Sequence, residues 1–282
     1  MVIGDLLKEA TKVLAAAGID SARLESEVLL SFILEKERLY LAINRNQEVT
    51  NEREKAFRKL VMRRKEKEPV AYIVGSREFM SLNFSVAPGV LIPRPDTETL
   101  VEFAIEMLSE KENPAIIDLC TGSGAIAVSL AHYLPTSRVK GVDVSDICVK
   151  TAKENAEKNA VADRVTVQQA DVFAYESDEL FDCVVSNPPY IPSAVIPTLE
   201  KDVADYEPHL ALDGGEDGYV FYRYLAQKGA SLLKSGGLLV LEVGHDQAET
   251  VATLLKETNA YKTVGARCDL AGIKRAVYGV KQ

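Results

Sequence analysis

The sequence contains no apolar run approaching the roughly 20 residues that a membrane-spanning helix needs. Its first residues, Met1 to Asp5, carry no basic charge ahead of an apolar stretch, so we expect no signal peptide and a cytoplasmic location. The four cysteines and three histidines stand apart, without the spacing of metal ligands. We therefore expect reduced thiols and no metal site.

Excess positive charge is also absent. The chain carries 33 Lys and Arg against 42 Asp and Glu, which gives a net charge of −9. Proteins that grip a phosphate backbone usually concentrate positive charge on one face, so we expect no direct nucleic-acid binding. Only the segment from Arg53 to Lys67 is locally basic, and at helical spacing this pattern is more typical of a solvated helix face.

The first 75 residues have the apolar periodicity of helices. Stripes over residues 3–17 and 21–34, and a third helix over 51–68, indicate a small helical bundle. Asn51 with Glu54 is a possible capping pair for the third helix. Residues 76–92 alternate and turn like a β-hairpin, which we interpret as a connector between two domains.

From residue 93 onward, expected strands alternate with helices. The strands are expected over residues 115–118, 138–143, 165–169, 181–186, 237–243, 262–267 and 273–280. Five alternations predict a parallel sheet with helices on both faces. The last two strands are joined by only residues 268–272, too few for a helical crossover, so the final strand must run antiparallel.

A glycine turn follows the first of these strands. Gly122 and Gly124 stand between an apolar strand and an apolar helix start, where backbone N–H groups can face a ligand. Asp143 ends the next strand about 20 residues later, where a carboxylate can accept ribose hydroxyls. NAD enzymes and S-adenosylmethionine enzymes both use this pattern. The alternative interpretation of Asp143 is a cap or turn residue before a helix starting near Ser145.

The tetrapeptide Asn187-Pro188-Pro189-Tyr190 follows the expected buried strand 181–186, where open α/β sheets bind ligands. Each of the two prolines fixes its own φ angle and lacks a backbone N–H donor. The nearby carbonyl oxygens therefore have no local donor to bond with. An amide side chain beside such a carbonyl can accept both hydrogens of a planar NH2 group. The alternative is a Pro-Pro turn that only ends the strand.

These motifs together resemble those of the PrmC/HemK family, the protein-(glutamine-N5) methyltransferases that modify peptide chain release factors. The resemblance covers nearly the whole chain and rests on residues 92–98, 118–124, 187–191, 207–212, 214–218 and 241–247. Three positions depart from the family pattern. Asp96 stands where Glu is frequent, Cys120 where Gly is frequent, and Val172 where an aromatic residue is frequent, which leaves Phe173 or aliphatic packing to border an adenine.

The family resemblance implies an α/β fold: a seven-stranded S-adenosylmethionine-dependent methyltransferase (Rossmann-like) domain over 93–282, with an amino-terminal helical bundle over 1–75 for substrate recognition and a β-hairpin connector over 76–92. It implies methyl transfer from S-adenosylmethionine, with S-adenosylhomocysteine as product, to the amide nitrogen N5 of the Gln in the Gly-Gly-Gln motif of class I peptide chain release factors.

The resemblance also implies site residues. Those for the cofactor are Cys120, Thr121, Gly122, Ser123, Gly124, Asp143, Asp171, Val172, Asn187 and Arg94. Those for the substrate are Asn187, Pro188, Pro189 and Tyr190, of which Asn187, Pro188 and Tyr190 are the catalytic set. For Arg94 the alternative is a structural role between its flanking prolines, and for Asp171 that of a loop residue after a strand.

Besides an inactive binding module that retains the fold, two other functions stay open from the residues alone. An amino methyltransferase acting on adenine or guanine of nucleic acid would present the same planar NH2 group to the same motif, although the acidic charge balance argues against it. A NAD-dependent oxidoreductase would use the same glycine turn, but its sheet would usually stay parallel.

Overall fold

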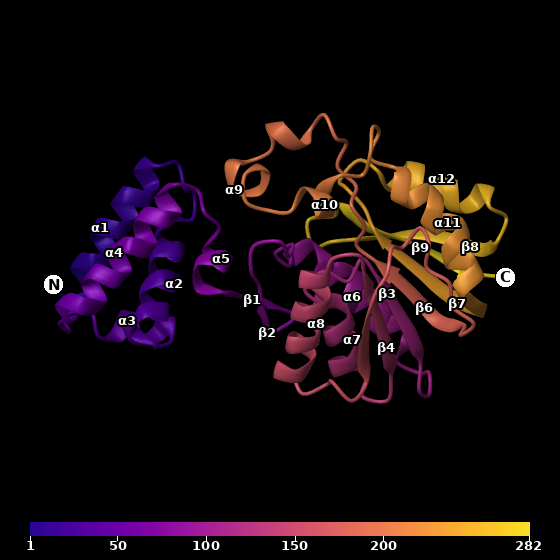
Figure 1. The fold of residues 1–282 in the computed structure, drawn as a ribbon, viewed down its shortest axis with the longest axis horizontal. Coiled ribbons are helices and arrows are strands. Elements are labelled where there is room, and N and C mark those ends of the chain that lie inside the picture. The colour runs from indigo at the N-terminus through magenta and orange to yellow at the C-terminus, as the bar shows by residue number, and fades with distance from the viewer. The chain divides into compact units, whose positions relative to one another are not determined.

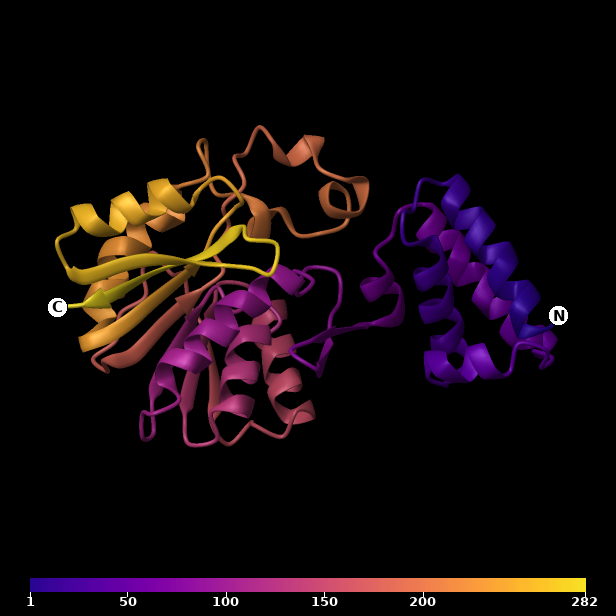
Figure 2. The ribbon, with the colours of Figure 1, turned by 180° about the vertical axis from the view of Figure 1, so that it is seen from behind.

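The computed structural model describes residues 1–282, which form two units (Figures 1 and 2). The first unit comprises Met1–Ser76 together with the distant segment Glu200–Tyr206. The second comprises Arg77–Leu199 and Glu207–Gln282. None of the helices combines the length and apolarity that crossing a membrane requires.

The first unit is helical. Its helices are α1 (Ile3–Ala16), α2 (Ala22–Leu34), α3 (Arg38–Ile43), α4 (Asn51–Lys65), α5 (Val70–Val74) and the short α9 (Lys201–Ala204). The apolar stripes of α1, α2 and α4 meet in one core that buries Leu6, Leu29 and Phe57. The buried Arg64 forms ion pairs with Glu25 and with Asp202, which tie the distant segment to the bundle.

The cap of α4 differs from the expected one. Thr50 is the N-cap, because its hydroxyl oxygen accepts a hydrogen bond from the backbone N–H of Arg53 at 3.4 Å. Asn51 is already the first helical residue, and Glu54 pairs with the amino-terminal ammonium group and Arg58. Thr and Asn are both competent caps, and the extended backbone of Thr50 places its side chain ahead of the first turn.

The second unit contains a seven-stranded sheet with the strand order β5-β4-β3-β6-β7-β9-β8. The strands are β3 (Ala115–Leu119), β4 (Arg138–Asp143), β5 (Val165–Gln169), β6 (Phe181–Ser186), β7 (Leu233–Glu242), β8 (Tyr261–Cys268) and β9 (Lys274–Lys281). The pairings from β5 to β7 are parallel, and β9 runs antiparallel to both β7 and β8. The predicted reversed terminal hairpin is confirmed.

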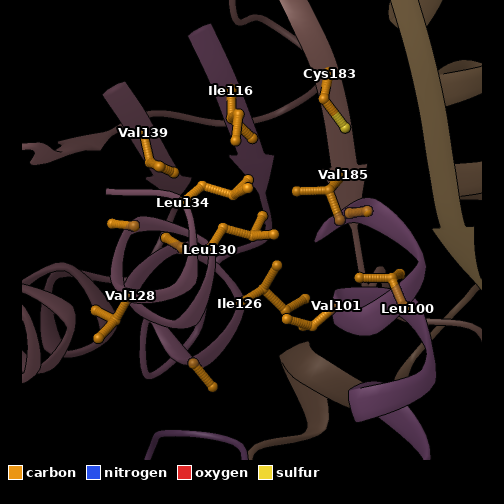
Figure 3. Packing of buried hydrophobic residues seen from close by; sticks show 14 of the residues in the cluster. Leu100, Val101, Ile116, Ile126, Val128, Leu130, Leu134, Val139, Cys183 and Val185 are labelled. Atoms are coloured by element: carbon orange, nitrogen blue, oxygen red, sulfur yellow. The ribbon is translucent and has the colours of Figure 1, made fainter. Parts of the chain in front are cut away.

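Helices cover both faces of this sheet (Figure 1). One face carries α6 (Pro95–Leu108), α7 (Ala125–Tyr133) and α8 (Asp146–Lys158), and the other carries α11 (Val220–Leu232) and α12 (Ala248–Glu257). Successive strand residues point to opposite faces, so Ile116 packs in the core beneath α6 and α7 while Ile117 packs in the other core. Figure 3 shows the first core, where Ile126 and Leu130 of α7 approach the strand residues.

Two further segments complete the second unit. The hairpin of β1 (Ser76–Phe79) and β2 (Leu82–Ser85) packs on α8, because the Asn155 side chain both donates to and accepts from the Ser85 backbone. Between β6 and α11 the chain forms η1 (Ile196–Thr198) and α10 (His209–Leu212). Residues 77–92 thus belong to the sheet unit, and Gly89 and Leu91 line its cavity.

Candidate active site

A cavity of about 410 Å³ lies at the carboxyl ends of the central parallel strands. This volume is in the range of small-molecule sites, and the position is where open α/β sheets bind ligands. The structure brings the following residues from the sequence analysis to its wall: Arg94, Cys120, Thr121, Gly122, Ser123, Asp143, Asp171, Val172, Asn187 and Pro189. Gly124, Pro188 and Tyr190 do not line the cavity.

Asp118 stabilises the turn after β3 by hydrogen bonds. This fully buried carboxylate accepts a hydrogen bond from the Thr121 hydroxyl at 2.6 Å and one from the Ala127 N–H at 3.2 Å. Burial raises the pKa of Asp118 to about 7, although both hydrogen bonds act in the opposite direction. Asp118 therefore fixes the turn and the start of α7 from a position that a ligand does not reach.

Three residues of this turn have a positive φ, and they differ in their structural roles. Gly124 has φ +79°, and a Cβ there would come within 2.9 Å of the Ala152 Cβ on α8, so this glycine permits close packing of the turn on α8. Gly122 has φ +56° and lines the cavity, with open space where a Cβ would stand. Cys120 has φ +62° without being glycine, which is a strained conformation for an L-residue.

Asp143 combines a turn role with a place on the cavity wall. Its Oδ1 accepts from the Ser145 N–H at 3.0 Å and its Oδ2 from the Gly122 N–H at 2.8 Å. An ionised carboxylate has about four lone-pair sites, so acceptor capacity remains for ligand hydroxyls. Burial raises the pKa of Asp143, opposed by these backbone hydrogen bonds. Ser145, not Asp143, is the N-cap of α8.

Aromatic rings form one wall of the cavity. Phe173 and Phe221 both line it, with ring centroids 4.9 Å apart. The Asp171 Oδ1 accepts from the Phe173 N–H at 2.9 Å, which fixes the loop that presents this ring. Val172 is buried in the core beneath α11, so Phe173 presents the aromatic surface that Val172 lacks. Phe221 lies on α11, and no motif of the sequence singled it out.

Arg94 is held by a partner while it lines the cavity. Its guanidinium Nη2 lies 2.5 Å from Oε1 of the buried Glu207. Its backbone is the N-cap of α6, directly ahead of Pro95. The ion pair gives Arg94 a structural task in joining the start of α6 to the segment that follows the short helices.

The loop 187–190 is fixed through its backbone. The Gln247 Nε2 donates to the Tyr190 carbonyl at 3.0 Å. Gly218 packs against the same group, since a Cβ there would lie 2.5 Å from the Tyr190 carbonyl oxygen. No backbone N–H donates to the Pro188 carbonyl. The motifs containing Gly218 and Gln247 therefore hold the loop, and the Pro188 carbonyl keeps its acceptor sites.

Asn187 presents a side-chain amide at the cavity wall. Its Nδ2 donates to the Thr97 Oγ1 at 3.3 Å, and no hydrogen bond within the chain reaches its Oδ1. Tyr190 is half-buried, and burial raises the pKa of its hydroxyl, so it stays protonated at neutral pH. Thr97 received no role in the sequence analysis, although it lies within the motif stretch 92–98.

Two family models match parts of the chain. Residues 5–75 match the family model of the PrmC N-terminal domain, and residues 93–205 match that of the methyltransferase small domain. Among solved structures, a methyltransferase from Pyrococcus furiosus has a TM-score of 0.54 at 16% identity, over 72% of this chain and 90% of that one. That likeness shows the fold of the second unit.

Curated relatives match over almost the full length. A release factor glutamine methyltransferase from Moorella thermoacetica is 45% identical over 98% of this chain and 97% of its own. Proteins of the same name from Clostridium botulinum and Clostridium acetobutylicum are each 40% identical, over 98% and 100% of this chain and 98% and 99% of their own.

Proposed function

This chain belongs to the release factor glutamine methyltransferase family, and from that premise we propose that it transfers a methyl group from S-adenosylmethionine to the amide nitrogen of the Gln in the Gly-Gly-Gln motif of class I peptide chain release factors. One observation carries the proposal. Asn187 and Pro188 offer two oxygen acceptors, the amide Oδ1 and a backbone carbonyl, that no donor of the chain's backbone occupies.

The cavity fits S-adenosylmethionine. Asp143 would accept the ribose hydroxyls, the turn from Cys120 to Ser123 would surround the methionine part, and Phe173 with Phe221 would border the adenine ring. A volume of about 410 Å³ suits a ligand of this size. When bound, the cofactor would supply an electrophilic methyl group on its sulfonium sulfur.

The chain's own residues would orient and polarise the nucleophile. A carboxamide nitrogen is a poor nucleophile because its lone pair is delocalised into the carbonyl. The Asn187 Oδ1 and the Pro188 carbonyl would each accept one of its N–H groups and stabilise positive charge as it develops on the nitrogen. Orientation of two bound reactants is worth about 7 to 11 kcal/mol, so attack requires no strong base. The methylated nitrogen would then release one proton to water. Tyr190 would pack against the glutamine.

We propose that the first unit recognises the release factor, because the second unit already contains every residue of the cavity wall. A chain that begins at Arg77 should bind S-adenosylhomocysteine like the full chain and methylate a release factor poorly, provided circular dichroism shows it folded. Equal catalytic efficiency of both chains would refute this role. A release factor as substrate favours a cytoplasmic enzyme. The net charge of −9 favours an enzyme that makes no direct contact with nucleic acid.

Two measurements separate this function from its rivals. Calorimetric titration should show binding of S-adenosylhomocysteine and none of NADH, whereas the reverse would favour the oxidoreductase. Methyl-labelled S-adenosylmethionine, incubated with the enzyme and either a release factor or total nucleic acid, should label the release factor alone. Label in nucleic acid would favour a base amino methyltransferase, and binding without transfer to any acceptor would favour a module that has lost activity.

A further inference from the structure

Three polar side chains from separate elements form a row that starts at the cavity wall, which Asn187 and Thr97 line, and ends at Glu242 behind it. Asn187 follows β6, Thr97 lies in the first turn of α6, and Glu242 ends β7. The Asn187 Nδ2 lies 3.3 Å from the Thr97 Oγ1, and the Thr97 hydroxyl in turn makes a hydrogen bond with the Glu242 carboxyl group. Thr97 and Glu242 are 4% and 2% exposed, so water competes little for the contact between them.

The chemistry of the three groups gives this row a direction. Above its pKa of about 7, the Glu242 carboxylate carries no hydrogen and only accepts, so the single hydroxyl hydrogen of Thr97 is donated to Glu242. The Thr97 Oγ1 is then left with lone pairs only toward Asn187. Of the two ends of the Asn187 amide, only the NH2 group can donate a hydrogen bond to the Thr97 Oγ1. The amide oxygen Oδ1 then points away from Thr97.

We propose that Thr97 and Glu242 are positioning residues that set the orientation of the Asn187 amide, so that its Oδ1 rather than its NH2 meets the substrate nitrogen. The inference rests on the proposed function, because it concerns the nucleophile's acceptor. An amide flipped by half a turn would present its own N–H groups to the glutamine N–H group that the Asn187 Oδ1 should accept. Such a contact would repel the substrate nitrogen instead of orienting it.

The surroundings make this a rigid arrangement. The Tyr222 hydroxyl donates to the Glu242 backbone carbonyl at 2.8 Å and also contacts the Gln247 Oε1 at 3.3 Å, which holds the end of β7. The second carboxyl oxygen of Glu242 has no hydrogen-bond partner, so the contact with Thr97 is the one that orients this group. Thr97 sits on the rigid first turn of α6, which Pro95 starts.

Thr97→Val tests the proposal, because valine has the shape of threonine and neither donates nor accepts. We expect the single-turnover methylation rate of a release factor to fall about 10-fold or more at saturating cofactor, since small misplacements of a reacting group are costly. Affinity for S-adenosylhomocysteine should stay within about twofold. Thr97→Ser, which keeps the hydroxyl, should restore most of the rate. Thr151→Val on α8, which removes another buried threonine hydroxyl away from the cavity, should leave the rate unchanged.

A second readout requires no activity. In NMR spectra of protein labelled with ¹⁵N-asparagine, the side-chain NH2 signal of Asn187 is identified as the one that disappears in Asn187→Ala. Its hydrogen-bonded proton should lose protection from exchange in Thr97→Val and keep it in Thr97→Ser. If the parent methylates the release factor while Thr97→Val matches it in rate and in amide protection, the positioning role is refuted and the proposed function stands. If the parent methylates no release factor, the proposed function fails instead.

Discussion

The Gln247 side chain is hydrogen-bonded to the Tyr190 backbone carbonyl at 3.0 Å and accepts from the Gly244 N–H at 3.0 Å through its other end. It is 5% exposed. A residue after β7 thereby fixes the conformation of the loop that follows β6. The position of the Asn187 and Pro188 acceptors therefore depends on a side chain that does not line the cavity.

Gln247→Leu should destabilise the chain by about 1 to 3 kcal/mol, because it leaves the buried Tyr190 carbonyl and Gly244 N–H unpaired. Turnover should fall more than cofactor affinity does. Urea unfolding and single-turnover methylation measure the two effects. Gln168→Leu on β5, where the side chain is exposed, is the matched control and should change neither. A fully stable, fully active Gln247→Leu would show that the loop holds itself.

Cys120→Gly should stabilise the chain by about 1 kcal/mol or slightly more, because Cys120 has φ +62° and a non-glycine residue is strained there. The glycine's extra freedom in the unfolded chain offsets part of this gain. Cys120→Ala keeps the Cβ and hence the strain, so it should not show the gain. A lower unfolding midpoint for the glycine variant than for the alanine variant would contradict the strain argument.

Asp143→Ala should weaken S-adenosylhomocysteine binding by roughly 1.5 to 3 kcal/mol, the value of a lost charge-assisted hydrogen bond, without unfolding the protein. The loss of its contacts with Gly122 and Ser145 should add to the effect by loosening the turn. Asp146→Ala, an exposed carboxylate in the first turn of α8, is the control. Calorimetric titration decides, and unchanged affinity in Asp143→Ala would remove this residue from the cofactor site.

Asn187→Ala should lower single-turnover methylation by roughly 10²-fold or more at saturating cofactor, by analogy with the loss of one transition-state hydrogen bond. Asn187→Asp keeps an acceptor of nearly the same size and should retain more activity than the alanine variant. It should remain below the parent, because it cannot donate to the Thr97 Oγ1. An alanine variant as fast as the parent would reduce Asn187 to a turn residue.

Glu242 should make stability depend on pH. Burial raises its pKa to about 7, while the hydrogen bond from Thr97 acts in the opposite direction. The folded chain therefore binds this proton more tightly than the unfolded chain, and Glu242 costs stability as pH rises from about 4.5 to about 7. Glu242→Gln removes this titration. Its free energy of unfolding relative to the parent should increase from pH 5 to pH 8, and a pH-independent difference would contradict the assignment.

Local patterns in the sequence predicted most of the fold. The alternation of strands and helices indicated a sheet covered on both faces, and the short connection 268–272 required β9 to reverse. The strand β7 begins at Leu233, earlier than expected, because Leu233 pairs with Phe181. The register then shifts before Leu238 pairs with Cys183. Such an irregularity depends on the neighbouring strand.

The sequence predicted those site residues that belong to motifs at the ends of strands. Asp143 and Asn187 follow strands and reach one cavity because the sheet is parallel there. The contact of Asn187 with Thr97 joins two elements far apart in sequence, and no periodicity reports which side chains meet across such a distance. For the same reason the tie between Arg64 and Asp202 in the first unit was not anticipated.

The most direct measurement of the central claim is mass spectrometry of a class I release factor after incubation with this chain and S-adenosylmethionine. The account predicts one added methyl group on the side-chain amide of the Gln in Gly-Gly-Gln, and almost none with Asn187→Ala over the same time. A methyl group on another residue, or an unmodified release factor beside enzyme that binds S-adenosylhomocysteine, would contradict it.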